Sequence, residues 1–259
     1  MKSVLLLLIG VLCLNVDLFS QDTVSELVTD RPDKTESASI VPVGWLQIET
    51  GLEFSTEEID NDSKLNSINI AGTLFRYGIA ERLEIRLGGT YLIENNKQQS
   101  FETETKGLAD FMFGAKYNFV SEQQSVPDVA ILFHLFMPLG AENFKPMKTE
   151  PQMVVSIAKS VTDFLSLGSN IGGQYNSSDV EINYLYTLTA GFSLTEKLGS
   201  FVEFYSELYP SEKPFISLAA GFTFLLLPNL QLDISGGNGL FHNPKFWYFN
   251  SGISIRIPR

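Results

Sequence analysis

The sequence predicts an all-β fold, a transmembrane antiparallel up-and-down β-barrel of about twelve strands that follows an N-terminal signal peptide. Between Trp45 and Ile257 apolar and polar residues alternate in runs of about ten residues, the length of a tilted strand that crosses a membrane. The N-terminus has the pattern of an export signal. After residue 20 no uncharged apolar stretch reaches about eighteen residues, the length needed by a membrane-spanning helix.

The first element is the predicted signal peptide, residues 1–20. Lys2 precedes an apolar run at residues 4–14, and cleavage is expected after Ser20. The only cysteine, Cys13, lies inside this apolar run. The exported chain would therefore contain no cysteine, which excludes disulfides, thiolate metal sites and a cysteine nucleophile.

The composition fits a barrel in a membrane. Hydrophobic residues make up 44% of the chain and charged residues 19%, while the polar strand faces keep the mean hydropathy at +0.07. The formal net charge of -12 argues against binding of nucleic acid.

The second element, residues 21–44, lies between the signal peptide and the barrel, and its prolines discourage a helix. We expect one of two arrangements. The segment folds into the barrel lumen as a plug or constriction, or it is a flexible periplasmic leader. The candidate plug residues are its charged side chains Asp30, Arg31, Asp33, Lys34 and Glu36.

The third element, residues 45–259, contains the barrel. The predicted strands are residues 45–54, 66–77, 83–93, 107–119, 128–138, 150–160, 164–175, 182–194, 199–209, 214–226, 230–240 and 246–257. Connections after even strands are mostly tight, whereas the long polar connections 55–65, 94–106 and 139–149 follow odd strands. Because short turns of such barrels face the periplasm, both termini are expected there.

The fourth strand shows the two faces most clearly. Phe113 and Tyr117 lie on its predicted lipid face, and Asp110 and Lys116 lie on its predicted lumen face. Arg76 interrupts this pattern, because it falls on the apolar face of the second strand. It lies near the predicted rim, where a long side chain can extend to water or a β-bulge can turn it inward.

Charged residues on the predicted lumen faces are the candidate pore-lining residues. They are Glu49, Glu53, Glu84, Arg86, Asp110, Lys116, Glu203, Glu207, Asp233 and Arg256. If water fills the lumen, this acidic surplus favours cations; alternatively, the charges pair across neighbouring strands and fill a narrow interior. In the plug hypothesis, Arg31 and Lys34 pair with inward carboxylates such as Glu49, Glu84 or Asp110.

Candidate catalytic and metal-binding groups are sparse. His134 and His242 have no metal-ligand spacing, and no nucleophile, base and orienting group are brought together by the sequence. Glu203 and Glu207 share a strand face, but the rise of a strand separates them by about 13 Å, too far for a directly coupled acid–base pair. We therefore expect no enzyme activity, no cofactor and no metal.

Several motifs resemble one family of outer-membrane proteins. These are residues 29–38 and 41–51, with looser matches at 75–79, 83–86, 107–110 and 114–117. The chain is similar here to the outer-membrane transporter-like family labelled "putative meta-pathway of phenol degradation", found in Gram-negative bacteria including Bacteroidetes. The resemblance spans essentially the whole exported chain. It implies a location in the outer membrane and passage of aromatic or other small hydrophobic compounds.

The sequence therefore predicts a porin-like outer-membrane barrel that passes or binds small molecules. The alternatives are a structural or surface-adhesive barrel with a closed lumen and, third, a barrel enzyme. Expected partners are the lipid bilayer, a small-molecule solute and the barrel-assembly machinery, whose recognition pattern the last strand partly resembles at Asn250, Gly252, Ile255 and Ile257. The protein is expected to be a monomer.

Overall fold

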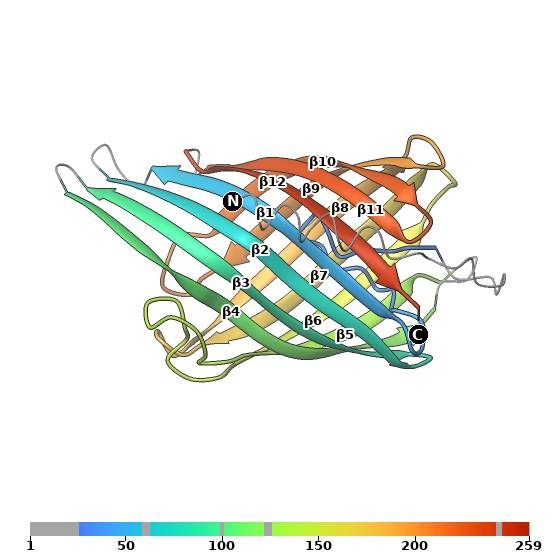
Figure 1. Ribbon diagram of the computed structural model, residues 1–259, viewed down its shortest axis with the longest axis horizontal. Helices are drawn as coiled ribbons and strands as arrows, with labels where there is room; N and C mark the ends of the chain where they lie inside the picture. Colours follow the sequence, from blue (N-terminus) through green and yellow to red (C-terminus); the bar gives the residue numbers. More distant parts are fainter. Residues whose placement is uncertain (1–25, 59–62, 99–100, 122–125, 242–244, 259) are drawn as a thin grey trace, which may run out of the picture.

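Twelve antiparallel strands form one closed barrel in the computed structural model (Figure 1). The structure describes residues 26–58, 63–98, 101–121, 126–241 and 245–258, so the predicted signal peptide and His242 lie outside the described residues. No helix in these residues is long and apolar enough to span a membrane. The predicted up-and-down barrel of twelve strands is confirmed. The strands are β1 (Leu46–Glu58), β2 (Ser63–Ala80), β3 (Leu83–Gln98), β4 (Phe101–Val120), β5 (Asp128–Phe136), β6 (Glu150–Ser160), β7 (Leu165–Asn176), β8 (Glu181–Ser193), β9 (Leu198–Leu208), β10 (Phe215–Leu227), β11 (Leu230–Gly239) and β12 (Trp247–Ile257).

The first and last strands close the barrel. Leu46 of β1 pairs with Ile257 of β12, and the register continues to Thr56 opposite Trp247. Each strand also pairs with its neighbour in the chain, so every strand has two partners and the backbone hydrogen bonds are satisfied around the ring. We call the end where β1 begins and β12 ends the turn end, and the opposite end the loop end.

The barrel has an apolar outer face and a polar interior. On β4, Phe113 is 50% exposed on the outside, whereas Lys116 is completely buried on the inside. The largest fully buried side chains include Arg76, Arg86 and Glu84, which is the reverse of a soluble protein core. The interior must therefore be held together by paired charges and hydrogen bonds.

Two β-bulges explain where the simple alternation fails. Ala71 in β2 and Asp110 in β4 have positive φ angles of 52° and 55°, and the strand register shifts beside each of them. An extra residue reverses which face the following side chains occupy. The bulge in β2 places Arg76 inside the barrel, as the sequence analysis allowed. The bulge in β4 places Ala109, which is 1% exposed, on the opposite face from Phe113.

Strands β1 to β4 are longer than predicted and extend beyond the others at the loop end, at the left of Figure 1. The prediction that residues 55–65 and 94–106 are long loops was therefore wrong. Polar cross-strand pairs continue the ladder there: Lys97 lies opposite Glu102 with an ion pair of 3.2 Å. Backbone pairing and such pairs suffice for a strand in water, without an apolar face. The loop at residues 137–149 instead packs against β4, where Ala141 N donates to Leu108 O.

Candidate functional site in the barrel lumen

Residues 26–45, which we call the N-terminal segment, lie inside the barrel (Figure 1). The segment enters the lumen from the turn end, turns near Lys34 and returns towards β1. Val28 O and Ser39 O, one on each arm of this loop, both accept hydrogen bonds from the Arg76 guanidinium. The segment ends against β2, where Gly44 N donates to Gly78 O. A Cβ at Gly78 would lie 2.2 Å from Val41 O, so only glycine permits this close approach.

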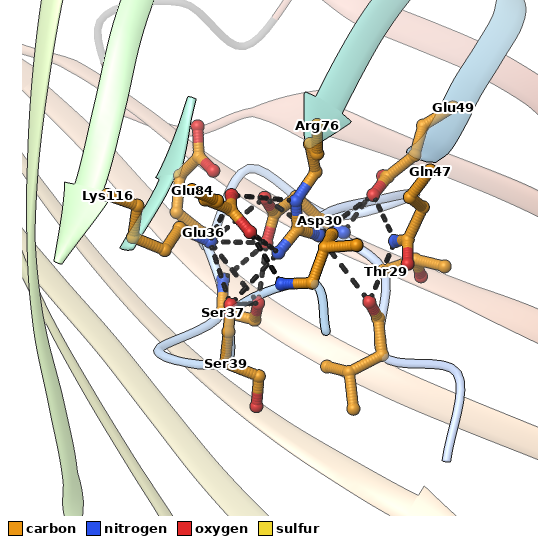
Figure 2. A network of polar contacts seen from close by, with 12 residues as sticks. Thr29, Asp30, Glu36, Ser37, Ser39, Gln47, Glu49, Arg76, Glu84 and Lys116 are labelled. Carbon is orange, nitrogen blue, oxygen red and sulfur yellow. Dashed lines mark hydrogen bonds and ion pairs between the residues drawn. The ribbon is translucent and has the colours of Figure 1, made fainter. Parts of the chain in front are cut away.

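A buried set of charges joins the N-terminal segment to β1–β4 (Figure 2). Asp30 lies at its centre, 2.9 Å from Arg86, 3.1 Å from Arg76 and 3.1 Å from Lys116. The Arg76 guanidinium also donates to Glu49 and to Glu84, each at 2.9 Å. We call this set the charged cluster; it comprises Asp30, Glu36, Glu49, Arg76, Glu84, Arg86 and Lys116.

The surroundings in the charged cluster shift the pKa values of Asp30 and Glu36, the two carboxyl groups that the N-terminal segment contributes to it. Burial alone would raise the pKa of Asp30, but Arg76, Lys116 and Arg86 together hold this pKa well below its ordinary value of 3.8. Burial raises the pKa of Glu36 from 4.5 to about 7, although Arg86 lies 2.6 Å away. Asp30 is therefore an anion that all three cations share.

Hydrogen bonds without ion pairs hold the other side of the segment, against β6 to β9. The Thr35 hydroxyl donates to Glu203 at 2.6 Å and lies 2.8 Å from the Thr187 hydroxyl, and all three side chains are buried. Glu36 N donates to Asn170 Oδ1 at 2.6 Å, and Ser156 Oγ donates to Glu36 O at 2.6 Å. The segment is thus fastened on opposite walls of the lumen.

The two basic residues of the segment bind inward carboxylates of the predicted set, although not the examples Glu49 and Glu84. Arg31 binds Asp233 at 3.0 Å, and Lys34 lies 3.7 Å from Glu53. The expected partners Glu49 and Glu84 are bound to Arg76 instead. The reason is the bulge in β2, which brings the Arg76 cation into the lumen beside these carboxylates, so they are already neutralised.

A further set of contacts lies at the turn end. Arg256 Nε donates to Gln47 Oε1 at 2.9 Å, and Gln47 in turn donates to Val28 O at 2.9 Å. Gln231 Nε2 donates to Thr29 Oγ1 at 2.8 Å. The entering arm of the segment is therefore bound close to the point where it enters the barrel.

The ten predicted pore-lining residues lie on the inner wall. Eight of them contact the N-terminal segment through their charged groups: Glu49, Glu53, Glu84, Arg86, Lys116, Glu203, Asp233 and Arg256. Glu207 instead accepts hydrogen bonds from Tyr205 and Tyr209. Asp110 lines a cavity. The structure adds inner-wall residues that the sequence analysis did not select, namely Gln47, Arg76, Asn170, Thr187 and Asn250.

The segment lies between two cavities. The loop-side cavity, about 410 Å³, is lined by the tip residues Arg31, Lys34 and Glu36 and by wall residues that include Asp110. The turn-side cavity, about 320 Å³, is lined by the two arms, at Glu26, Val28, Ser39 and Ile40, and by wall residues. A path through the lumen must therefore pass the N-terminal segment.

The wall formed by β9 to β12 carries aromatic rings that face the lumen. Tyr205 packs on Phe215 with ring centres 6.1 Å apart, Phe215 on Phe246 at 5.1 Å, and Phe246 on Tyr248 at 6.1 Å. Lys34 Nζ lies 5.9 Å from the centre of the Tyr248 ring. We call these four residues the aromatic strip. It leads from the loop end to the tip of the N-terminal segment.

His134 is the histidine that the structure describes. This side chain is buried on the inner wall, and its Nδ1 lies 2.8 Å from Gln152 Oε1. In the part of the chain that the structure describes, no three His, Cys, Asp or Glu side chains are grouped so as to hold a metal ion. His134 is thus a member of a polar ladder on the wall.

Comparison with known proteins places the chain in a structural context. The profile of the family described as "Putative MetA-pathway of phenol degradation" matches residues 29–257. No curated protein matches the sequence. Among solved structures, the COG4313 outer membrane channel from Pseudomonas putida F1 aligns with a TM-score of 0.66 at 13% identity, over 84% of this chain and 97% of that one.

Two further structures share the barrel. The KdgM porin aligns with a TM-score of 0.52 at 13% identity over 81% of this chain and 98% of that one. The translocator domain of the autotransporter NalP from Neisseria meningitidis aligns with a TM-score of 0.53 at 11% identity, over 83% and 89% respectively. The fold of this chain is thus that of outer-membrane barrels, as the sequence predicted.

Proposed function

Because this chain belongs to the family described as "Putative MetA-pathway of phenol degradation", we propose that it is an outer-membrane channel for small molecules whose lumen is closed by its own N-terminal segment. The observation that carries the proposal is the position of the segment between the loop-side and turn-side cavities. Passage then requires that the segment shifts or leaves. We propose the predicted plug role for this segment, as far as the structure describes it, from residue 26.

The bonding of the segment supports a removable plug. Almost all of its contacts with the wall use side chains, such as Arg76 to Ser39 O and Glu84 to Val41 N. The barrel strands are paired to one another independently of the segment. Withdrawal of the segment would therefore leave the backbone ladder of the barrel intact.

We further propose that the solutes are apolar or aromatic compounds. The aromatic strip supports this, because its rings offer edge and face contacts to another ring along the way to the segment. Replacement of Phe246 by Ala should reduce uptake of a small phenolic compound by cells that carry the protein in their outer membrane. Trp247, the next residue, is 46% exposed on the outer face, so Trp247→Ala is the matched control. Equal uptake by both variants would contradict the aromatic route.

Removal of residues 22–40 tests the plug itself. In planar bilayers the truncated barrel should conduct more than the full protein and should prefer cations. The charged wall residues left facing water include the seven predicted carboxylates and four bases, Arg76, Arg86, Lys116 and Arg256. Unchanged conductance would instead favour the alternative, a structural or adhesive barrel whose interior is permanently filled.

A further inference from the structure

The Arg31 side chain lies in a notch of the inner wall that is formed by β1, β11 and β12. Gly51 of β1 lies opposite Gly252 of β12, and Gly252 lies opposite Asp233 of β11. A Cβ placed on Gly51 would lie 2.4 Å from the Arg31 guanidinium, and one placed on Gly252 would lie 2.3 Å from it. The absence of side chains at these two positions therefore creates the space that the guanidinium fills.

The polar groups of the notch match a guanidinium group. Asp233 Oδ2 accepts from Arg31 Nε at 3.3 Å and Asp233 Oδ1 accepts from Nη2 at 3.0 Å, while Asn250 Oδ1 also accepts from Nη2. Two parallel bonds to one carboxylate are the fork geometry that arginine makes and that lysine cannot make. The Asp233 side chain is completely buried, so its charge needs a bound cation.

The notch belongs to the wall, whereas its occupant belongs to the N-terminal segment. Arg31, Gly51 and Asn250 also line the loop-side cavity, which is open to a solute of small-molecule size. A solute that enters from the loop end can therefore reach the edge of the notch while Arg31 is still in place.

We propose that this notch is a binding site for guanidinium-type solutes, which are planar cations bearing amino groups, and that Arg31 occupies it as a built-in ligand. A solute with a guanidinium or amidinium group displaces Arg31, removes one of the fastenings of the N-terminal segment and favours the open channel. The gating part of this inference rests on the proposed channel function. The binding part does not.

Selectivity follows from the shape of the notch. An ammonium ion has the same charge but cannot donate in one plane to both Asp233 oxygens and to Asn250. It also fills less of the flat space between Gly51 and Gly252. Ethylguanidinium should therefore bind about tenfold more tightly than ethylammonium, which corresponds to about 1.4 kcal/mol.

The test of binding uses Arg31→Ala, which vacates the notch, in the full-length protein in detergent. Titration calorimetry with ethylguanidinium should detect a site, and ethylammonium should bind about tenfold more weakly. Two double variants test the notch. Gly252→Ala together with Arg31→Ala fills the space, and Asp233→Asn together with Arg31→Ala removes the charge but keeps the shape. Each second change should abolish the binding of ethylguanidinium. Equal binding of both cations, or binding that survives both second changes, would overturn the proposal.

The test of gating uses the unaltered protein in planar bilayers. Millimolar ethylguanidinium should raise the conductance several-fold, whereas ethylammonium should not. If Arg31→Ala binds ethylguanidinium but the unaltered protein shows no rise, the displacement of Arg31 is refuted and the site alone stands. Failure of the channel function itself would show separately, as unchanged conductance after removal of residues 22–40.

Discussion

Replacement of Asp30 by Asn should release the N-terminal segment without unfolding the barrel. The Asp30 carboxylate is 4% exposed and lies within 3.1 Å of Arg76, Arg86 and Lys116. Asn keeps the size of the side chain but removes its charge. Three buried cations then share only the carboxylates of Glu36, Glu49 and Glu84.

The magnitude follows from the burial of these groups. Removing one partner from a buried ion pair costs about 3–5 kcal/mol, because the remaining charge loses both water and its counter-ion. Asp30 belongs to the segment and not to a strand, so this loss falls mainly on the docked position of the segment. At about 1.4 kcal/mol per factor of ten, the docking equilibrium should shift by roughly two to three and a half powers of ten.

Single-channel recording in planar bilayers measures this shift as open probability. Asp179→Asn is the control, since it makes the same chemical change at an exposed loop residue whose carboxylate accepts a hydrogen bond from Asn176. Asp30→Asn should open the channel for most of the recording time, and Asp179→Asn should behave as the unaltered protein. If both variants remain equally closed, the charged cluster does not hold the segment and the reasoning fails.

Three other perturbations have defined outcomes. Asp30 stabilises the docked segment fully above its ordinary pKa of 3.8, and this stabilisation is lost as the pH falls through its lower docked pKa. Glu36 has the opposite dependence: it stabilises the docked segment fully below its ordinary pKa of 4.5, and this stabilisation is lost as the pH rises through about 7. Conductance should therefore pass through a minimum in mildly acidic buffer, and Glu36→Gln should abolish only the rise towards neutral pH. Phe113→Lys should cost about 2–4 kcal/mol of barrel stability in lipid, while Asp110→Asn should be tolerated, as unfolding titrations in vesicles would show; the reverse order would mean that the inner and outer faces are exchanged. Arg76→Met leaves the buried Glu49 and Glu84 without their shared cation and should lower the barrel's melting temperature in detergent, more than Arg82→Met at the turn end does.

The strand pattern was predictable because alternation of apolar and polar residues has the period of a β-strand. It located all twelve strands and placed residues such as Lys116 and Glu203 on the inner wall. The ends of β2 to β4 were not predictable from that signal, since strands that extend into water carry polar residues on both faces. The bulge at Ala71 also left no clear mark, although Arg76 on an apparently apolar face was its consequence.

The partners of the N-terminal segment could not be predicted from the sequence, for a different reason. A loop has no periodicity, so nothing in the order of residues sets Arg31 beside Asp233 or Thr35 beside Glu203. These pairs depend on the three-dimensional closure of the barrel, which brings β9, β11 and β12 next to residues near the start of the chain. A useful signal in hindsight is the pair of glycines at 51 and 252, which stand on inner faces where other positions carry charged or polar side chains.

A reversible lock on the segment tests the central claim most directly. The hydroxyl oxygens of Thr35 and Thr187 are 2.8 Å apart in the buried interior, so cysteines at both positions are placed to form a disulfide between segment and wall. The only natural cysteine lies in the predicted signal peptide and would not compete. Thr35→Cys alone is the control. Solute flux through the double variant should be lost under oxidising conditions and recovered after reduction. Undiminished flux in the oxidised protein would show that solutes pass without movement of the N-terminal segment, and the account would be wrong.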